Sequence, residues 1–108
     1  MLKLNPWFEE MVMLHIKKAI YKKVKTIALE FVEYSGKYEI DMQDYINSKS
    51  FYLIKELNDE SKFSDFKIDH GVVCWSNGFD IAPEYLFFLA NKDNPKYKTL
   101  FMEWGYLN

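Results

Sequence analysis

Apolar and polar residues alternate in the first third of the chain, a pattern that predicts β-strands. Between residues 24 and 32, apolar side chains occupy every second position, at Ile27, Leu29 and Phe31. This two-residue period is typical of a sheet with one buried face. Residues 14–21 are also strand-like, and residues 38–40 follow a turn at Gly36. We therefore predict a three-stranded antiparallel meander.

A further hairpin is predicted around residue 70. Residues 72–75 are two valines, a cysteine and a tryptophan, which suit a pleated, half-buried surface. Residues 67–69 come just before them, separated by His70 and Gly71, which have the composition of a turn. We expect His70 to be exposed in this turn and Cys74 to be buried in the second strand.

A tight turn and a helix are predicted directly after this hairpin. Asn77 and Gly78 tolerate the positive φ angles of a tight reversal, and Trp75 before them suits the core. Asp80 precedes an apolar segment, so its carboxylate is predicted to cap the helix, and Pro83 fits the first helical turn. We expect this helix to reach about Ala90.

Shorter helices are predicted elsewhere in the chain. Asp41 is placed to cap a helix over residues 42–46, with Asp44 in its first turn, where the helix dipole favours negative charge. Residues 51–57 carry apolar side chains at a spacing that fits a helix somewhat better than a strand. Near the N-terminus, Asn5 followed by Pro6 predicts another short helix.

The C-terminal region predicts an aromatic helix with one apolar stripe. Asn94 and Pro95 can cap and start it, and Gly105 can end it. The stripe has helical spacing and consists of Tyr97, Leu100, Phe101 and Trp104. One interpretation makes the stripe an interface with a second copy or with a partner protein. The other lets it fold back within one chain over Tyr85, Phe88 and Leu89.

Length and composition indicate a single folded domain. The chain has 108 residues, of which 49% are apolar and 19% aromatic, so it can bury one core. The expected class is α+β, with a small antiparallel meander sheet and a further hairpin, helices packed on them, and an aromatic pair of helices at the C-terminus.

Charge and chemistry exclude several function classes. The chain has 14 basic and 16 acidic residues, and its net charge of -2 does not favour nucleic-acid binding by the chain itself. All 14 basic residues are lysine, and the absence of arginine also disfavours such binding. The lysines at 17, 18, 22, 23 and 25 suggest a phosphate patch or, as we favour, a solvated strand edge. No segment has the length and apolarity of a membrane span or leader, which predicts a cytoplasmic protein.

No catalytic residue, metal ligand or cofactor site is predicted. His15 and His70 have no ligand or nucleophile at a suitable spacing, and the carboxylates of Asp41 and Asp44 are explained by helix capping. The single Cys74 excludes an internal disulfide. The sequence therefore favours a protein that is not an enzyme.

Residues 75–86, WSNGFDIAPEYL, resemble the W-x-N-G-x-D-(I/L)-x-P-x-x-L pattern of the domain of unknown function 2442 family, a family of small bacterial proteins. The likeness extends over residues 16–90, which leaves residues 91–108 as a C-terminal helical extension. Members similar to this family often look like antitoxin-type partners of small neighbouring proteins. The resemblance says little about activity, because the family has none assigned.

These observations predict a non-enzymatic protein-interaction module, an antitoxin-like partner of a small protein or a homo-oligomer. The alternative is a sensor that binds a small ligand. Its aromatic pocket would lie near Trp75 and Tyr85, with Asp80 or Asn77 as the polar contact.

Overall fold

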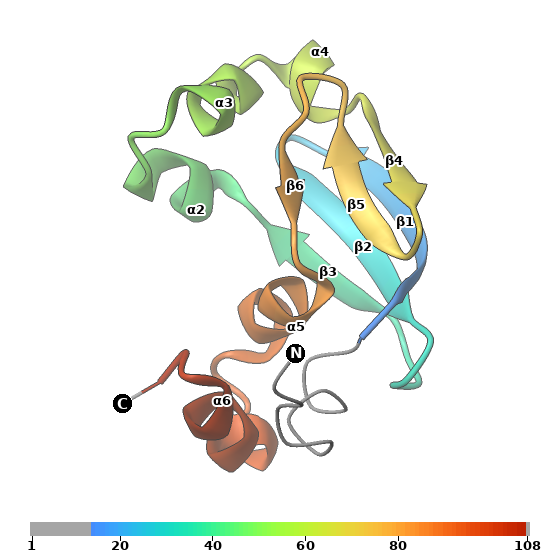
Figure 1. The fold of residues 1–108 in the computed structure, drawn as a ribbon, viewed down its shortest axis with the longest axis vertical. Helices are drawn as coiled ribbons and strands as arrows, with labels where there is room; N and C mark the ends of the chain where they lie inside the picture. The colour runs from blue at the N-terminus through green and yellow to red at the C-terminus, as the bar shows by residue number, and fades with distance from the viewer. Residues whose placement is uncertain (1–13, 108) are drawn as a thin grey trace, which may run out of the picture.

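The computed structural model describes residues 14–107, which form two three-stranded antiparallel sheets and several helices (Figure 1). This architecture confirms the α+β class predicted from the sequence. The strands are β1 (Ile16–Lys23), β2 (Thr26–Phe31), β3 (Tyr38–Asp41), β4 (Phe66–Asp69), β5 (Val72–Trp75) and β6 (Asp80–Ile81). The helices are α2 (Gln43–Ser48), α3 (Tyr52–Lys55), α4 (Glu60–Phe63), α5 (Pro83–Asn91) and α6 (Lys98–Trp104), with short 3₁₀ turns at Glu56–Asn58 and Pro95–Tyr97.

The first sheet is the predicted meander, with strand order β1-β2-β3. Ile27 lies opposite Tyr21 on one side and Ile40 on the other, and both pairings are antiparallel. The alternation in β2 has its expected effect, because Ile27, Leu29 and Phe31 are all buried. A two-residue turn joins β1 to β2, and Lys25 in that turn has a φ of 52°.

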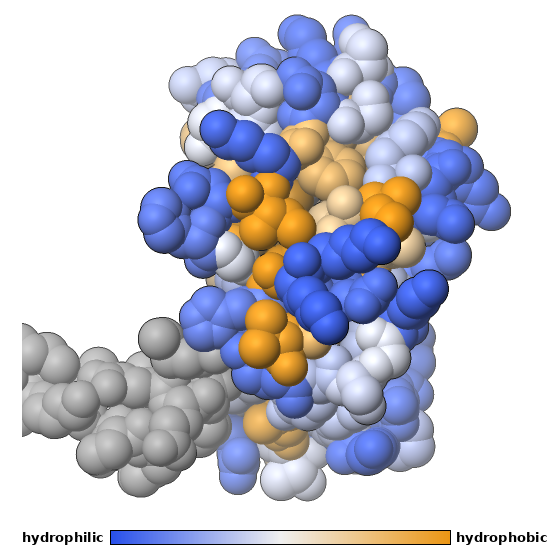
Figure 2. Space-filling model, turned by 90° about the vertical axis from the view of Figure 1, so that its right-hand side faces the viewer, coloured by the Kyte–Doolittle hydropathy of each residue, from blue (hydrophilic) through white to orange (hydrophobic). Residues whose placement is uncertain are grey.

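The second sheet has strand order β4-β5-β6. Its β4–β5 hairpin confirms the predicted pairing through His70 and Gly71, and His70 is exposed as expected. Strand β6 has two residues and was not predicted, because so short a strand has no recognisable period. The amide of Ile16 donates to the Gly71 carbonyl at 2.8 Å, which joins the start of β1 to the second sheet. Figure 2 shows the side of the molecule on which β1 and β4 lie.

Helices α2 to α4 connect the two sheets. The Asp41 carboxylate accepts the Gln43 amide at 3.0 Å, so it binds the start of α2 from the end of β3, although the N-cap position itself belongs to Met42. Helix α4 has a cap that was not predicted: Asp59 accepts the amide of Ser61 at 2.9 Å. The short helix predicted to begin at Asn5 and Pro6 lies outside the described residues.

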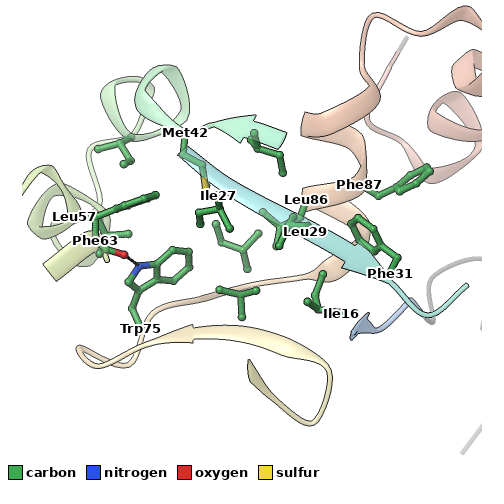
Figure 3. Close-up of a cluster of buried hydrophobic side chains, with 14 of the residues drawn as sticks. Ile16, Ile27, Leu29, Phe31, Met42, Leu57, Phe63, Trp75, Leu86 and Phe87 are labelled. Carbon is green, nitrogen blue, oxygen red and sulfur yellow. Dashed lines mark hydrogen bonds between the residues drawn. The ribbon is translucent and has the colours of Figure 1, made fainter. Parts of the chain in front are cut away.

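One hydrophobic core fills the space between the sheets and the helices (Figure 3). At one end, Trp75 of β5 lies against Phe63 of α4, and at the other end Phe87 of α5 lies against Phe31 of β2. Phe63 and Phe87 are both fully buried. The buried apolar side chains come from both sheets and from all five α-helices, so no described element forms a separate core.

The C-terminal helix α6 lies against α5 in the same chain. Phe101 is fully buried, with its ring 5.1 Å from that of Phe88 and 6.0 Å from that of Phe87. Gly105 ends the helix with a φ of 87°, as its position predicted. No helix within residues 14–107 combines the length and the apolarity that a membrane span requires.

Candidate functional site

Asn77 fixes the position of the β5–β6 turn through three hydrogen bonds. Its side-chain oxygen accepts the amide of Phe79 at 2.9 Å, which shapes the turn itself. Its amide group donates to the carbonyl of Leu53 at 3.0 Å and to Oε1 of Glu56 at 2.9 Å. The polar group of Asn77 is therefore used to attach the turn to α3 and the 3₁₀ segment after it.

Trp75 and Gly78 complete this turn. The indole nitrogen of Trp75 donates to the carbonyl of Phe63 at 2.7 Å, and the side chain is 3% exposed (Figure 3). Gly78 has a φ of 93°, and a Cβ atom there would meet no neighbour within 4 Å. Glycine is therefore favoured at this position by the backbone conformation alone. Both residues have the structural roles that the sequence predicted.

The predicted capping role of Asp80 is wrong. Asp80 belongs to β6, where it pairs with Cys74, and the N-cap of α5 is Ala82, which has no side-chain cap. The strand continues for two residues after the turn, so the helix begins later than a cap at Asp80 would require. Pro83 occupies the first turn of α5, as predicted.

Glu84, which the sequence pattern did not single out, is the buried carboxylate of this region. It is 7% exposed, and its Oε2 accepts the amide of Leu14 at 2.7 Å. The bond joins the first turn of α5 to the residues before β1, where the positive end of a helix dipole also favours a negative charge. The bond stabilises the packing of α5 on the first sheet.

Within residues 14–107, the residues of the predicted ligand pocket are divided between two depressions. Trp75 and Asn77 line a shallow depression of ≈ 290 Å³ together with Glu56 and Leu57. Tyr85 and Asp80 line a different depression, whose other walls include Tyr45 and Lys49. Because Asn77 already bonds Leu53 and Glu56, its amide group is not free to orient a ligand in the first depression.

An ion pair between a buried lysine and a half-buried glutamate joins the β1–β2 turn to α4. Lys25 Nζ donates to Glu60 Oε1 at 2.5 Å and to the carbonyl of Asn58 at 3.0 Å, and the hydroxyl of Tyr21 donates to the other oxygen of Glu60. The Lys25 side chain is only 5% exposed. Its predicted place among solvated lysines is therefore wrong, because docking of α4 covers the turn.

Hydrogen bonding lowers the pKa of Glu60 below its ordinary value of 4.5. Burial opposes this shift, but the hydrogen bonds from Lys25 and Tyr21 outweigh it. A depressed carboxylate pKa stabilises the folded chain above pH 4.5, and this stabilisation is lost as the pH falls through the lower, folded-state value. The hydrogen bonds among Lys25, Glu60 and Tyr21 therefore stabilise the β1–β2 turn against α4.

Each of the two histidines pairs with one carboxylate among the described residues. His15 Nδ1 lies 2.6 Å from Glu33 Oε2, and His70 Nδ1 lies 2.7 Å from Asp69 Oδ1. Within residues 14–107, His, Cys, Asp and Glu form no group of three or more that could hold a metal ion. Cys74 is half-buried rather than buried as predicted, because it faces outward from β5. Burial and the nearby carboxylates raise the pKa of its thiol, which disfavours the reactive thiolate.

The predicted interface residues lie on α6 in mixed environments. Phe101 is buried, whereas Tyr97, Leu100 and Trp104 are half-buried and pack on the core of their own chain. The Trp104 ring lies 6.4 Å from that of Phe87. Its indole nitrogen is buried and has no hydrogen-bond acceptor within the described range. The most exposed apolar residue of the helix is Met102, at 46%, which the predicted stripe does not include.

Replacement of Asn77 by alanine is expected to reduce the free energy of unfolding by about 2 kcal/mol, because the Leu53 carbonyl, the Glu56 carboxylate and the Phe79 amide each lose a partly buried hydrogen bond. Urea denaturation followed by tryptophan fluorescence measures the change. Asn47→Ala is the matched control, since Asn47 is exposed and bonds only Gln43 among the described residues. Equal stabilities for the two variants would contradict the anchoring role of Asn77.

Comparisons with protein-family models, with curated proteins and with solved structures give no match to this chain. The resemblance of residues 75–86 to the domain of unknown function 2442 family therefore stays a prediction. In the structure these residues form the end of β5, the β5–β6 turn, β6 and the first turn of α5.

Proposed function

We propose that this chain is a non-enzymatic protein-interaction module that binds a small protein partner in an antitoxin-like manner. The observation that carries the proposal is the exposure of Met102, which is 46% exposed beside the half-buried Leu100 and Trp104 on α6. Methionine and aromatic residues are enriched at protein interfaces, and the exposed Met102 beside the half-buried Trp104 gives α6 this composition.

The hydrogen bonds made by the polar groups of residues 75–86 support the same proposal. Asn77, Glu84 and the Trp75 indole each bond a group of their own chain, so their chemistry maintains the fold. Ser76 likewise donates to Asp65 at 2.6 Å in the exposed part of the turn. An active site would require some of these groups to be directed at a substrate instead.

The test compares two charge insertions on α6. Met102→Glu is expected to abolish capture of a stoichiometric partner, because it places a carboxylate in the proposed interface. Thr99→Glu, on an exposed position of the same helix, is the matched control and should retain capture. The measurement is affinity purification of the tagged full chain from its host, with the partner quantified by mass spectrometry.

Trp104→Ala is a poorer test, because Trp104 also packs against Phe87 and Phe101 and its loss would weaken the fold. Thermal unfolding of both charge variants checks that the fold is intact. Undiminished capture by a folded Met102→Glu variant would refute the α6 interface. If the wild type sediments as a dimer and Met102→Glu sediments as a monomer, the partner is instead a second copy of the chain.

A further inference from the structure

Five exposed lysines lie on β1 and β4, the strands on the side of the molecule shown in Figure 2. Strand β1 contributes four of them and β4, which lies against β1, contributes the fifth: Lys17, Lys18, Lys22, Lys23 and Lys67. Register shifts near both ends of β1 leave two consecutive lysines exposed at each end. None of the five forms a salt bridge with an acidic residue among residues 14–107. We call these five residues the lysine side.

Aliphatic side chains interrupt the lysine side. Ile20, in the middle of β1, is 44% exposed, and Ile68 of β4 is 36% exposed. Figure 2 shows hydrophobic patches between hydrophilic side chains on this side of the molecule. A strand edge that lysines merely protect from aggregation needs no such apolar positions at its centre. The combination of exposed lysines with exposed aliphatic side chains indicates a surface that a partner covers.

The backbone of this side also has open edges. Among the described strands, β1 pairs with β2 alone and β4 pairs with β5 alone. The bond from the Ile16 amide to the Gly71 carbonyl is the one backbone hydrogen bond recorded between β1 and the β4–β5 hairpin within residues 14–107. Unpaired strand edges supply amide and carbonyl groups to which an added extended segment can bond.

Charge decides which segment fits. Three acids lie on or next to the lysine side: Glu30, opposite Lys18 on β2, Glu39, which lines the same surface depression as Lys18 and Lys22, and Asp69, which pairs with His70. The side is therefore basic, although the whole chain has a net charge of -2. The lysine side repels the lysine side of a second copy, and it also repels any basic strand. It therefore selects against both of these partners. A segment with acidic residues is attracted to the same surface.

We infer that the lysine side is the docking surface for an extended, acidic segment of a partner protein, with aliphatic residues at alternate positions. The partner's carboxylates would pair with Lys18 and Lys22 on either side of Ile20. Its aliphatic side chains would point to the opposite face of the added strand and cover Ile68, which pairs with the buried Val73. A nucleic acid fits this surface less well, because the chain has no arginine and the lysine side presents aliphatic side chains instead of stacking aromatic rings. The inference rests on the proposed interaction role but concerns a different surface from α6.

The test uses a fluorescein-labelled peptide in which Glu and Val alternate, and measures fluorescence anisotropy with the full chain. The variant Lys18→Glu/Lys22→Glu is expected to weaken binding by about tenfold or more, because two attractions become repulsions. The variant Lys92→Glu/Lys98→Glu changes the net charge equally at two exposed positions beyond α5 and should bind as the wild type does. Rescue provides a further check: a peptide of alternating Lys and Val should bind the Lys18→Glu/Lys22→Glu variant better than the wild type.

Several outcomes overturn the inference. These are absence of binding by the Glu-Val peptide, equal loss in both double variants, and tighter binding of a single-stranded oligothymidine than of the peptide. Hydrogen exchange locates the contact, because a docked strand should slow amide exchange in β1 or β4. Met102→Glu should leave peptide binding unchanged, so a failed peptide experiment and a failed α6 interface are distinguishable.

Discussion

Replacement of Phe87 by alanine is expected to lower the free energy of unfolding by about 3–5 kcal/mol, the largest effect of any single change considered for this chain. Phe87 is fully buried at the point where α5 meets the first sheet. Its ring is 5.2 Å from that of Phe31, 4.4 Å from that of Tyr34 and 5.0 Å from that of Tyr97. The cavity left by the ring would remove the contacts of α5 with β2, with the β2–β3 turn and with the C-terminal segment at the same time.

Phe51→Ala is the matched control, because it removes the same side chain from a position that is 50% exposed. The control should change the free energy of unfolding by about 0.5 kcal/mol or less. Guanidinium denaturation monitored by circular dichroism compares the two variants. If Phe87→Ala were no more destabilising than Phe51→Ala, the C-terminal helices would not belong to the same core as the first sheet.

Replacement of Glu60 by glutamine is expected to destabilise the chain by about 2 kcal/mol, because it leaves the buried ammonium group of Lys25 without its counter-charge. The effect lies below that of a fully buried pair, since the Glu60 side chain is 36% exposed and the Asn58 carbonyl still binds Lys25. Thermal unfolding at neutral pH measures the loss.

The pH dependence separates the ion pair from a simple loss of packing. Because the pKa of Glu60 is lowered in the folded chain, the wild type should lose stability as the pH falls below 4.5, and Glu60→Gln should lose less over the same range. Glu103→Gln, at an exposed position of α6, is the control and should follow the wild type. Parallel acid profiles for wild type and Glu60→Gln would show that the ion pair does not stabilise the fold.

Much of the fold follows from local patterns. The alternation at residues 27, 29 and 31 predicts the buried face of β2, and Asn77–Gly78 predicts the reversal after β5. Pro83 and Gly105 mark a helix start and a helix end by their own backbone preferences. Each of these signals depends on neighbours within a few residues, which is why the sequence alone reveals it.

The missed features depend on contacts between distant parts of the chain. Lys25 and Glu60 are 35 positions apart, and Leu14 and Glu84 are 70 positions apart. Lysine in a turn is usually solvated, so only the docking of α4 shows that this one is buried. Asp80 was assigned to a helix cap because the two residues of β6, held by pairing with β5, are too few to produce a pattern.

The candidate surfaces were predicted only in part. The aromatic stripe of α6 has helical spacing, but its Phe101 is used inside the chain and the exposed Met102 lies beside the stripe. The lysines of β1 were recognised as a cluster, yet their combination with Ile20 and with Lys67 of β4 depends on the packing of the two sheets. Surfaces of this kind arise from tertiary structure and have no local signature.

Native mass spectrometry of the tagged full chain, purified from its own host without denaturant, tests the interaction role most directly. We expect an assembly in which one further polypeptide is bound to the chain in a fixed ratio and is absent from the Met102→Glu preparation. A preparation that contains the chain alone, or the chain with the added mass of a small metabolite, would contradict it.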